Sequence, residues 1–428
     1  MILSGTVFVS TIYGAAIVWY RLYLHPPSKY PGPFCKYYEI CLTFRITPNS
    51  VLINTPSGLK TIYNNKANVK EAVCYKVYHC NVHVTTTWIS IDNATHARKR
   101  RAMNHAFSDK ALRSSEPFIH SNIDRWIELL KEEIRKRQWS CSLHMARWAD
   151  RLVFDTLGDL YFGESFGTKE LFTSTIHSIG YSPCLDYLLA AAAPPAMSKA
   201  QIEDEMQARC KSGTESRKDF FQYLVLALDL ETGKGCSNEE VFSESGSLII
   251  AGSDTSAIGL AAAFFYLTRN PHAQEKHAKE SRAAFSSVGG IQGGAALHSS
   301  QYLRAFIQGT MRMSPPVPTD IAPEVQQGTK ASTVSYCMHH DPDMYPEPFK
   351  FRPERDSPES IYLAESAFMT FSAGPRGCVG KNLAYLEMSL TLAKTVYHFK
   401  IRRDHSSNIG GGSSGAINGR RIVDQYQL

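Results

Sequence analysis

One long run, from Ser237 to Asn270, contains no proline and is apolar on most sides in its second half. Ser237 followed by Glu240 is a capping-box pattern, which predicts that a helix begins there. Asn270 followed by Pro271 predicts where that helix ends. A helix that is apolar all round is expected to be buried all round. The run therefore predicts a long central helix inside a mainly helical fold.

The rest of the chain has the same helical character. Three further segments have helical patterns, namely Ile123–Arg137, about Ser300–Met313, and the NLAYLEMSLTLAKTVYHF run that follows Cys378. Strand-like runs are few and short, and the best are Val51–Asn54 and Ser332–Met338. We therefore expect a mainly α fold with a small β-subdomain.

Composition is typical of one large globular domain. The chain has 428 residues, of which 43% are hydrophobic and 20% charged, so it can bury a large core. No internal repeat or Gly/Ser-rich linker divides its middle. The formal charge of +6 is small for this length and gives no support to a nucleic-acid partner. Ten cysteines without a paired rhythm favour reduced thiols in a cytosolic environment over a disulfide scaffold.

The N-terminus has the features of a membrane anchor. Residues 1–20 carry no charge and are about long enough to cross a bilayer. Trp19 and Tyr20 lie where an interfacial aromatic belt is expected, and Arg21 follows. We predict an uncleaved transmembrane helix over 1–21, a Pro-rich connector over 22–33 and a catalytic domain over 34–428, on the cytosolic side of the endoplasmic reticulum membrane. A buried N-terminal helix is the alternative.

The segment FSAGPRGCVG, residues 371–380, has the composition of a loop that holds a metal-bound thiolate. Its glycines permit close backbone approach. Backbone donors of the loop and of the following helix can stabilise a negative sulfur at Cys378. Phe371 can shield the thiolate from water, and Arg376 offers a cation to a carboxylate. A buried structural cysteine in a Gly-rich turn is the alternative.

This segment resembles the haem-binding signature of the cytochrome P450 superfamily. The five fixed positions of that signature match Phe371, Gly374, Arg376, Cys378 and Gly380. The resemblance implies the cytochrome P450 fold, with haem b bound through Cys378 as the axial ligand of its iron. It also implies that the other four residues bind the cofactor.

A second motif, AGSDTS at residues 251–256, lies in the middle of the long apolar run. An acid and an alcohol are costly there unless they are hydrogen-bonded or functional. Gly252 and a back-bonding threonine hydroxyl together favour a local kink that holds a water. By resemblance, Asp254 and Thr255 are the catalytic pair that delivers protons during oxygen activation. A solvated turn or an interhelical hydrogen bond is the alternative.

The basic segment HARKRR, residues 96–101, resembles the helix that binds the haem carboxylates in this family. His96 and Arg100 are four residues apart, so they share a helix face and are candidates for that role. Lys99 and Arg101 are expected to point elsewhere and to face an acidic redox partner. A solvated basic run or a nucleic-acid patch is the alternative.

The chain departs from the family in one buried ion-pair motif. Arg312 matches the arginine of the Glu-x-x-Arg motif, but Gly309 occupies the glutamate position. Arg355, in HHDPDMYPEPFKFRPER, matches the arginine that completes the triad. Losing one member of a buried ion pair costs about 3–5 kcal/mol. The segments 35–43 and 324–328 are also compressed, so the small sheet is expected to be incomplete.

The resemblance implies a monooxygenase of the fungal microsomal type that hydroxylates a small lipophilic substrate in secondary-metabolite biosynthesis. Its partners would be O2, the membrane and NADPH-cytochrome P450 reductase, which supplies electrons from NADPH. We expect pocket walls from Val73–Trp88, Ile179–Pro195, Leu248–Ser256 and Val317–Ile321. Two other classes stay open: an enzyme that rearranges a peroxide, which the Asp254–Thr255 pair argues against, and a haem-poor, non-catalytic remnant, which Gly309 favours.

Overall fold

A computed structural model describes the protein over residues 13–16, 19–20, 43–63, 84–134, 139–140, 142–170, 217–229, 231–318, 329–354, 358–404 and 425–427. Several predictions lie outside these residues. They concern most of the N-terminal anchor, the connector, Arg355, the compressed segment 324–328 and the pocket walls at 73–83, 179–195 and 319–321.

The described part of the chain is mainly helical, as predicted. Its α-helices are α2 (Pro56–Tyr63), α3 (Asn93–Ala106), α4 (Asp109–Ile134), α5 (Met145–Phe162), α8 (Phe220–Val225), α9 (Asn238–Arg269), α10 (Pro271–Ala284), α11 (Ala295–Ser299), α12 (Gln301–Met313), α13 (Ser335–His339), α14 (Pro358–Ala367) and α15 (Lys381–His398). Its strands are β1 (Thr43–Thr47), β2 (Ser50–Ile53), β3 (Leu143–His144), β4 (Lys330–Ser332), β5 (Arg402–Arg403) and β6 (Gln425–Gln427).

Helix α9 is the predicted central helix. The Ser237 hydroxyl accepts from the Glu240 amide at 3.2 Å, and the Glu240 carboxylate accepts from the Ser237 amide at 3.1 Å, so the capping box is present. Helix α5 packs along α9. Among the described helices α9 alone is long and apolar enough to suit a membrane, but half of its most apolar window is buried inside the protein. It is the core helix of the domain.

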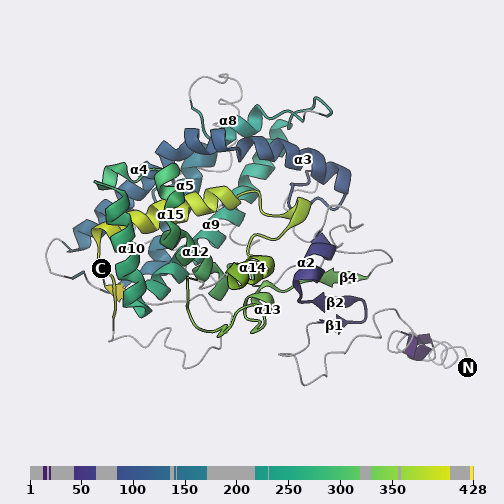
Figure 1. Cartoon of the computed structure of the whole chain (residues 1–428). Coiled ribbons are helices and arrows are strands. Elements are labelled where there is room, and N and C mark those ends of the chain that lie inside the picture. The colour runs from purple at the N-terminus through teal and green to yellow at the C-terminus, as the bar shows by residue number, and fades with distance from the viewer. Residues whose placement is uncertain are drawn as a thin grey trace, which may run out of the picture.

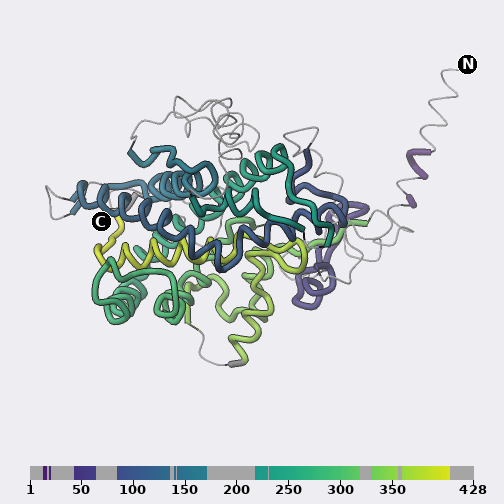
Figure 2. The backbone as a smooth tube through the Cα atoms, turned by 90° about the horizontal axis from the view of Figure 1, so that it is seen from above, coloured from purple at the N-terminus to yellow at the C-terminus, as the bar shows by residue number. Residues whose placement is uncertain are grey.

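Helix α15 joins the other helices around this core. It contacts α4, α9, α10 and α12, and it crosses the helical part of the molecule in Figures 1 and 2. Its bounds match the predicted helix after Cys378. Helix α4 extends further towards the N-terminus than the amphipathic segment indicated, because its face of Ala111, Leu112 and Ile119 is also buried, and Pro117 lies inside it.

The small β-subdomain lies beside the helices. Strands β1 and β2 pair antiparallel, and β4 joins β2 in parallel. Figure 1 shows this sheet next to α2, on one side of the helical part. The second sheet has the order β3-β6-β5.

The strand prediction for Val51–Asn54 agrees with β2, whereas the prediction for Ser332–Met338 is wrong beyond Ser332. Strand β4 ends at Ser332, and two residues later the Val334 amide donates to the Asn54 side chain at 2.9 Å instead of to a strand. The following residues then form helix α13.

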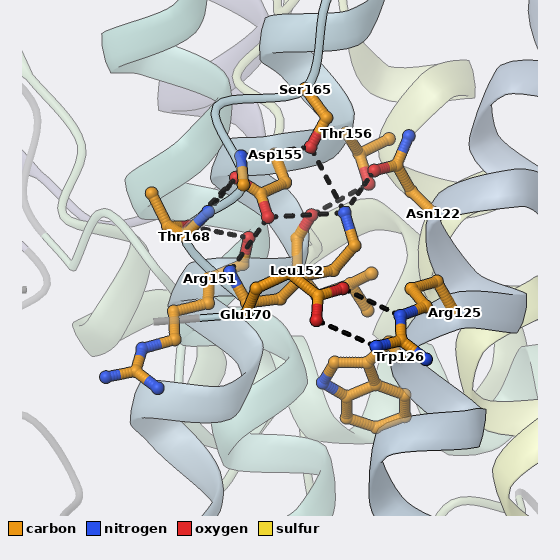
Figure 3. Close-up of polar contacts among 12 residues, drawn as sticks. Asn122, Arg125, Trp126, Arg151, Leu152, Asp155, Thr156, Ser165, Thr168 and Glu170 are labelled. Carbon is orange, nitrogen blue, oxygen red and sulfur yellow. Dashed lines mark hydrogen bonds and ion pairs between the residues drawn. The ribbon is translucent and has the colours of Figure 1, made fainter. Parts of the chain in front are cut away.

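The turn after α5 is fastened back onto the helices. Asp155 is fully buried and accepts from the Thr168 amide at 2.8 Å and from the Thr168 hydroxyl at 2.9 Å. Arg125 of α4 donates to both carboxylate oxygens of Glu170, at 2.7 and 2.8 Å. Figure 3 shows Thr168 turned towards Asp155 and Glu170 turned towards Arg125. These bonds fix the chain where it leaves the α4–α5 pair.

Candidate active site

The Cys378 loop connects α14 to α15 and is held by its own backbone. The Cys378 amide donates to the Phe371 carbonyl at 2.8 Å, and the Gly377 amide donates to the Gly374 carbonyl at 3.0 Å. Gly374 has φ of 66°, and a Cβ there would lie 1.8 Å from the carbonyl oxygen of Tyr63 in α2. Only glycine fits both conditions. The close approach predicted for the loop glycines is therefore made, at Gly374, against the protein's own backbone.

The thiol of Cys378 is exposed and yet closely surrounded by protein. Burial raises its pKa, while the amides of Gly380 and Lys381 and the charges of Arg100 and Lys381 oppose the rise. Two amide donors and two cations thus face the sulfur, as expected for a loop that stabilises a thiolate. The Phe371 ring packs at a tilt of 40° against Tyr385, with a centroid distance of 5.3 Å, and its predicted shielding role stays a prediction.

Two arginines and a histidine gather beside this loop. Arg100 donates to the carbonyl oxygens of Gly377 and, at 3.4 Å, of Pro375. His96 is 5% exposed, and its pKa is lowered to about 4, first by burial and then by the charges of Arg376 and Arg100. The structure therefore brings together His96, Arg100 and Arg376, which the sequence placed in two segments far apart in the chain.

The prediction that Lys99 faces a redox partner is wrong, whereas the same prediction for Arg101 stays a prediction. Lys99 is 3% exposed and forms ion pairs with Glu240 at 2.9 Å and Glu244 at 3.4 Å. Arg101 donates to Asp229 at 2.5 Å and lies 3.1 Å from Glu231. Lys99 is thus paired in the interior and Arg101 near the surface, because α9 and the segment after α8 place acidic residues against α3.

Asp254 and Thr255 lie half-buried in the middle of α9. The Thr255 hydroxyl donates to the Ala251 carbonyl at 2.7 Å, which is the predicted back-bond. Ala251 is exposed although the helix around it is largely buried. The helix assignment is continuous through this segment, and the predicted kink stays a prediction. Gly252 allows close packing instead, since a Cβ there would lie 2.8 Å from Leu157 of α5.

Arg312 is 3% exposed at the C-terminal end of α12. Its guanidinium donates to three backbone carbonyls, those of Pro348 at 2.6 Å, His339 at 3.0 Å and Lys350 at 3.1 Å. At the glutamate position of the motif, a Cβ on Gly309 would lie 3.3 Å from Pro353 Cα. Carbonyl dipoles thus contribute to holding this arginine.

The two glutamates that are buried in the described part of the chain were not predicted from the sequence. Glu244 of α9 is 2% exposed and binds Lys99 and Thr87, whereas Glu387 of α15 is 1% exposed and lies near Ser256. The only signal was an acid in the middle of an otherwise apolar helix face. For Glu244 that signal was weaker, because Glu239 and Glu240 precede it in a polar helix start.

A family model described as Cytochrome P450 matches residues 15–180 and 196–410 of the chain. The chain belongs to the cytochrome P450 family. The match covers the cysteine loop, α9 and α3 together, and with it the chain is assigned as a P450 monooxygenase that uses haem.

The chain is also similar to several P450 proteins of fungi. It is 31% identical to cytochrome P450 monooxygenase apf7 of Gibberella fujikuroi, over 99% of this chain and 94% of that protein. It is 33% identical to cytochrome P450 monooxygenase atnE of Emericella nidulans, over 91% and 88%. It is 28% identical to averantin hydroxylase of Dothistroma septosporum, over 93% and 86%.

The fold is shared with solved P450 structures. The crystal structure of the cytochrome P450DA heme domain has a TM-score of 0.68 at 16% identity, covering 86% of this chain and 85% of that one.

The residues of this chain suit a haem group. An exposed thiol with amide donors behind it is a suitable axial ligand for iron. The guanidinium groups of Arg100 and Arg376 lie beside it and suit the two carboxylates of haem, and His96 can donate a hydrogen bond to a carboxylate. Burial, and then the charges of Arg376 and Arg100, lower the pKa of His96 to about 4, so this histidine is neutral at pH 7.

Proposed function

We propose that this P450 hydroxylates a small lipophilic substrate in fungal secondary metabolism, with Cys378 as the ligand of the haem iron. The observation that carries the proposal is the Cys378 thiol, exposed on a loop whose amides and neighbouring cations favour its negative form. When bound, haem supplies the oxygen chemistry, which donation from a thiolate promotes. The similarity to averantin hydroxylase supports hydroxylation as the reaction type.

The chain's own residues would orient the group and supply protons. His96, Arg100 and Arg376 would hold its carboxylates, while Phe371, Gly374 and Gly380 shape the loop.

On α9, Thr255 donates its own proton to the Ala251 carbonyl, so its oxygen can accept a hydrogen bond from a water. Asp254, beside it, would exchange protons with the cytosol.

Electron supply and membrane attachment belong to the same proposal. We infer that NADPH-cytochrome P450 reductase delivers electrons from NADPH, and that residues 1–21 anchor the protein in the endoplasmic reticulum membrane. The described aromatic residues Tyr13, Trp19 and Tyr20 are all exposed, with Trp19 at 57%, as membrane contact requires. Membrane extraction with carbonate, which removes peripheral proteins only, tests the anchor.

A reduced, carbon-monoxide-treated membrane preparation tests the haem ligand. We expect the strongly red-shifted Soret band of a thiolate-bound haem, and its loss in Cys378→Ala. Cys337→Ala is the matched control, since Cys337 is half-buried and belongs to α13, not to the loop. A wild-type preparation without the band would refute the proposal.

The proton role of Thr255 has its own test. Thr255→Ala should consume oxygen with the reductase but yield little hydroxylated product. Thr268→Ala is the control, because Thr268 makes the same type of back-bond on α9, to the Phe264 carbonyl at 3.1 Å. Equal product yield per oxygen in the two variants would contradict the role.

A non-catalytic remnant is the second candidate, and Gly309 is the observation that favours it. The two candidates differ in one measurable property. A remnant would reach the membrane in a folded form but carry little haem, so the haem-to-protein ratio of the purified chain separates it from an enzyme.

A further inference from the structure

The segment 84–92 leads into α3 and lies between the two chemical elements of the site. Val84, Ile89 and Ser90 are buried, whereas Trp88 at the tip of the turn is 52% exposed. The Ser90 hydroxyl donates to the Thr86 carbonyl at 2.8 Å and closes the turn on itself. The segment is therefore a compact unit, so a contact at one end can fix the position of the other end.

One end of this unit is fixed to the Cys378 loop. Arg376, two residues before the cysteine, donates to the Ser90 carbonyl at 2.6 Å. It also donates to the side chain of Asn93 at 3.1 Å. The same arginine thus belongs both to the loop and to the beginning of α3.

The other end is fixed to α9 by a buried acid. One oxygen of Glu244 accepts from the Thr87 amide at 2.7 Å and from the Thr87 hydroxyl at 2.9 Å. That oxygen also lies 3.4 Å from Lys99 Nζ, and Lys99 is shared with Glu240 at 2.9 Å. Burial raises the pKa of Glu244, and Lys99 and Thr87 oppose that rise.

Burying an acid to hold a loop costs free energy, because the carboxylate loses its hydration. Well-packed apolar residues often stabilise a fold at least as well as a buried ion pair does. What the acid adds is direction, since one oxygen receives an amide, a hydroxyl and an ammonium in a set geometry. Such a contact fixes where the segment lies along α9.

We propose that Glu244 is a positioning residue that latches segment 84–92 to α9 and thereby sets the spacing between α9 and the Cys378 loop. This inference rests on the proposed function, because the spacing matters through the ligand held between the two elements. Larger ligands of the haem iron should sense the latch, whereas small ones should not.

Amide hydrogen exchange on the full-length protein tests the latch itself. In Glu244→Ala the amides of residues 87–91 should exchange about tenfold faster or more, because a buried charged acceptor is lost. The amides of α15 should not change, and Glu244→Gln should be intermediate. Glu239→Gln, an exposed acid on the same helix, is the matched control. Unchanged exchange at 87–91 in Glu244→Ala would overturn the latch.

Ligand titration of the haem-loaded protein tests the positioning role. The probes are imidazole and 4-phenylimidazole, followed by the Soret band. Glu244→Ala should lower the affinity for 4-phenylimidazole by about fivefold and the affinity for imidazole by less than about twofold. Thr87→Val should have an intermediate effect on the affinity for 4-phenylimidazole. A general loss of stability would lower the affinities for both probes equally. Equal changes in the two affinities, or no change in either, would therefore overturn the positioning role. A wild-type protein with no haem band would instead refute the proposed function, while the exchange result still reports on the latch.

Discussion

Arg312 and Glu387 are both buried ionisable groups in helices that pack against each other, and the protein accommodates them in opposite ways. A guanidinium cannot lose its proton in a protein, so Arg312 stays charged and is surrounded by three carbonyl dipoles. A carboxyl group can be neutralised. Burial raises the pKa of Glu387 to about 8, so this acid is mostly protonated at pH 7.

The environment of Glu387 agrees with a neutral acid. The Ser256 hydroxyl lies near enough to oppose the rise in pKa. Yet within the described residues neither carboxyl oxygen meets the geometry of a hydrogen bond. The comparison teaches that a group that is always charged requires a set of hydrogen-bond acceptors around it. A group that can be neutralised can be buried with few partners.

Removing the permanent charge should have the largest effect. We expect Arg312→Leu to lower the free energy of unfolding by about 3–5 kcal/mol, because three buried carbonyls lose a charged donor. Chemical denaturation followed by circular dichroism measures it. Arg312→Lys keeps a cation but cannot reach three acceptors, so it should lie between. A loss below about 1 kcal/mol for Arg312→Leu would mean that the hydrogen bonds from Arg312 to the three carbonyls do not stabilise α12.

Glu387 should make the stability of the folded protein depend on pH. The folded protein holds the Glu387 proton up to about pH 8, whereas the unfolded chain loses it near 4.5. The folded state therefore binds more protons across this window, and stability falls as pH rises, by at most about 1.4 kcal/mol per pH unit.

Glu387→Gln should flatten that dependence and raise the melting temperature at pH 8 relative to wild type. Thermal melts at pH 5, 6.5 and 8 measure the effect, with Glu365→Gln, an exposed acid of α14, as control. Parallel pH curves for wild type and Glu387→Gln would show that Glu387 is ionised in the folded protein.

Supplying a carboxylate at the motif position should have the smallest effect. Gly309→Glu places an acid one turn from Arg312, but a Cβ there lies 3.3 Å from Pro353 Cα and requires a small shift. We expect a net gain of about 1–2 kcal/mol and a higher haem-to-protein ratio. Gly309→Gln, with the same shape and no charge, isolates the electrostatic part. If the two variants behave alike, charge pairing is not what this position lacks.

Local signals in the sequence predicted the long helices well. The capping box at Ser237 and the prolines after Met313 gave helix ends within a residue or two of those found. The glycine pattern around Cys378 likewise predicted a tight loop followed by α15.

Partners far apart in the chain could not be predicted in this way. Lys99 was expected to face outwards, but it forms a buried ion pair with Glu244, which lies 145 residues away in the chain. Nor could the pattern foresee that β4 would end at Ser332, opposite Leu52 of β2, since a strand's length depends on its neighbour.

The contact between Gly374 and Tyr63 has a practical consequence for anyone who shortens this protein. Because α2 touches the cysteine loop through main-chain atoms, the first sheet and α2 form part of the loop's foundation. A version cut to improve solubility should therefore begin before Thr43, where β1 starts. A cut after α2 would leave the sulfur in place and remove Tyr63, against whose carbonyl the loop packs.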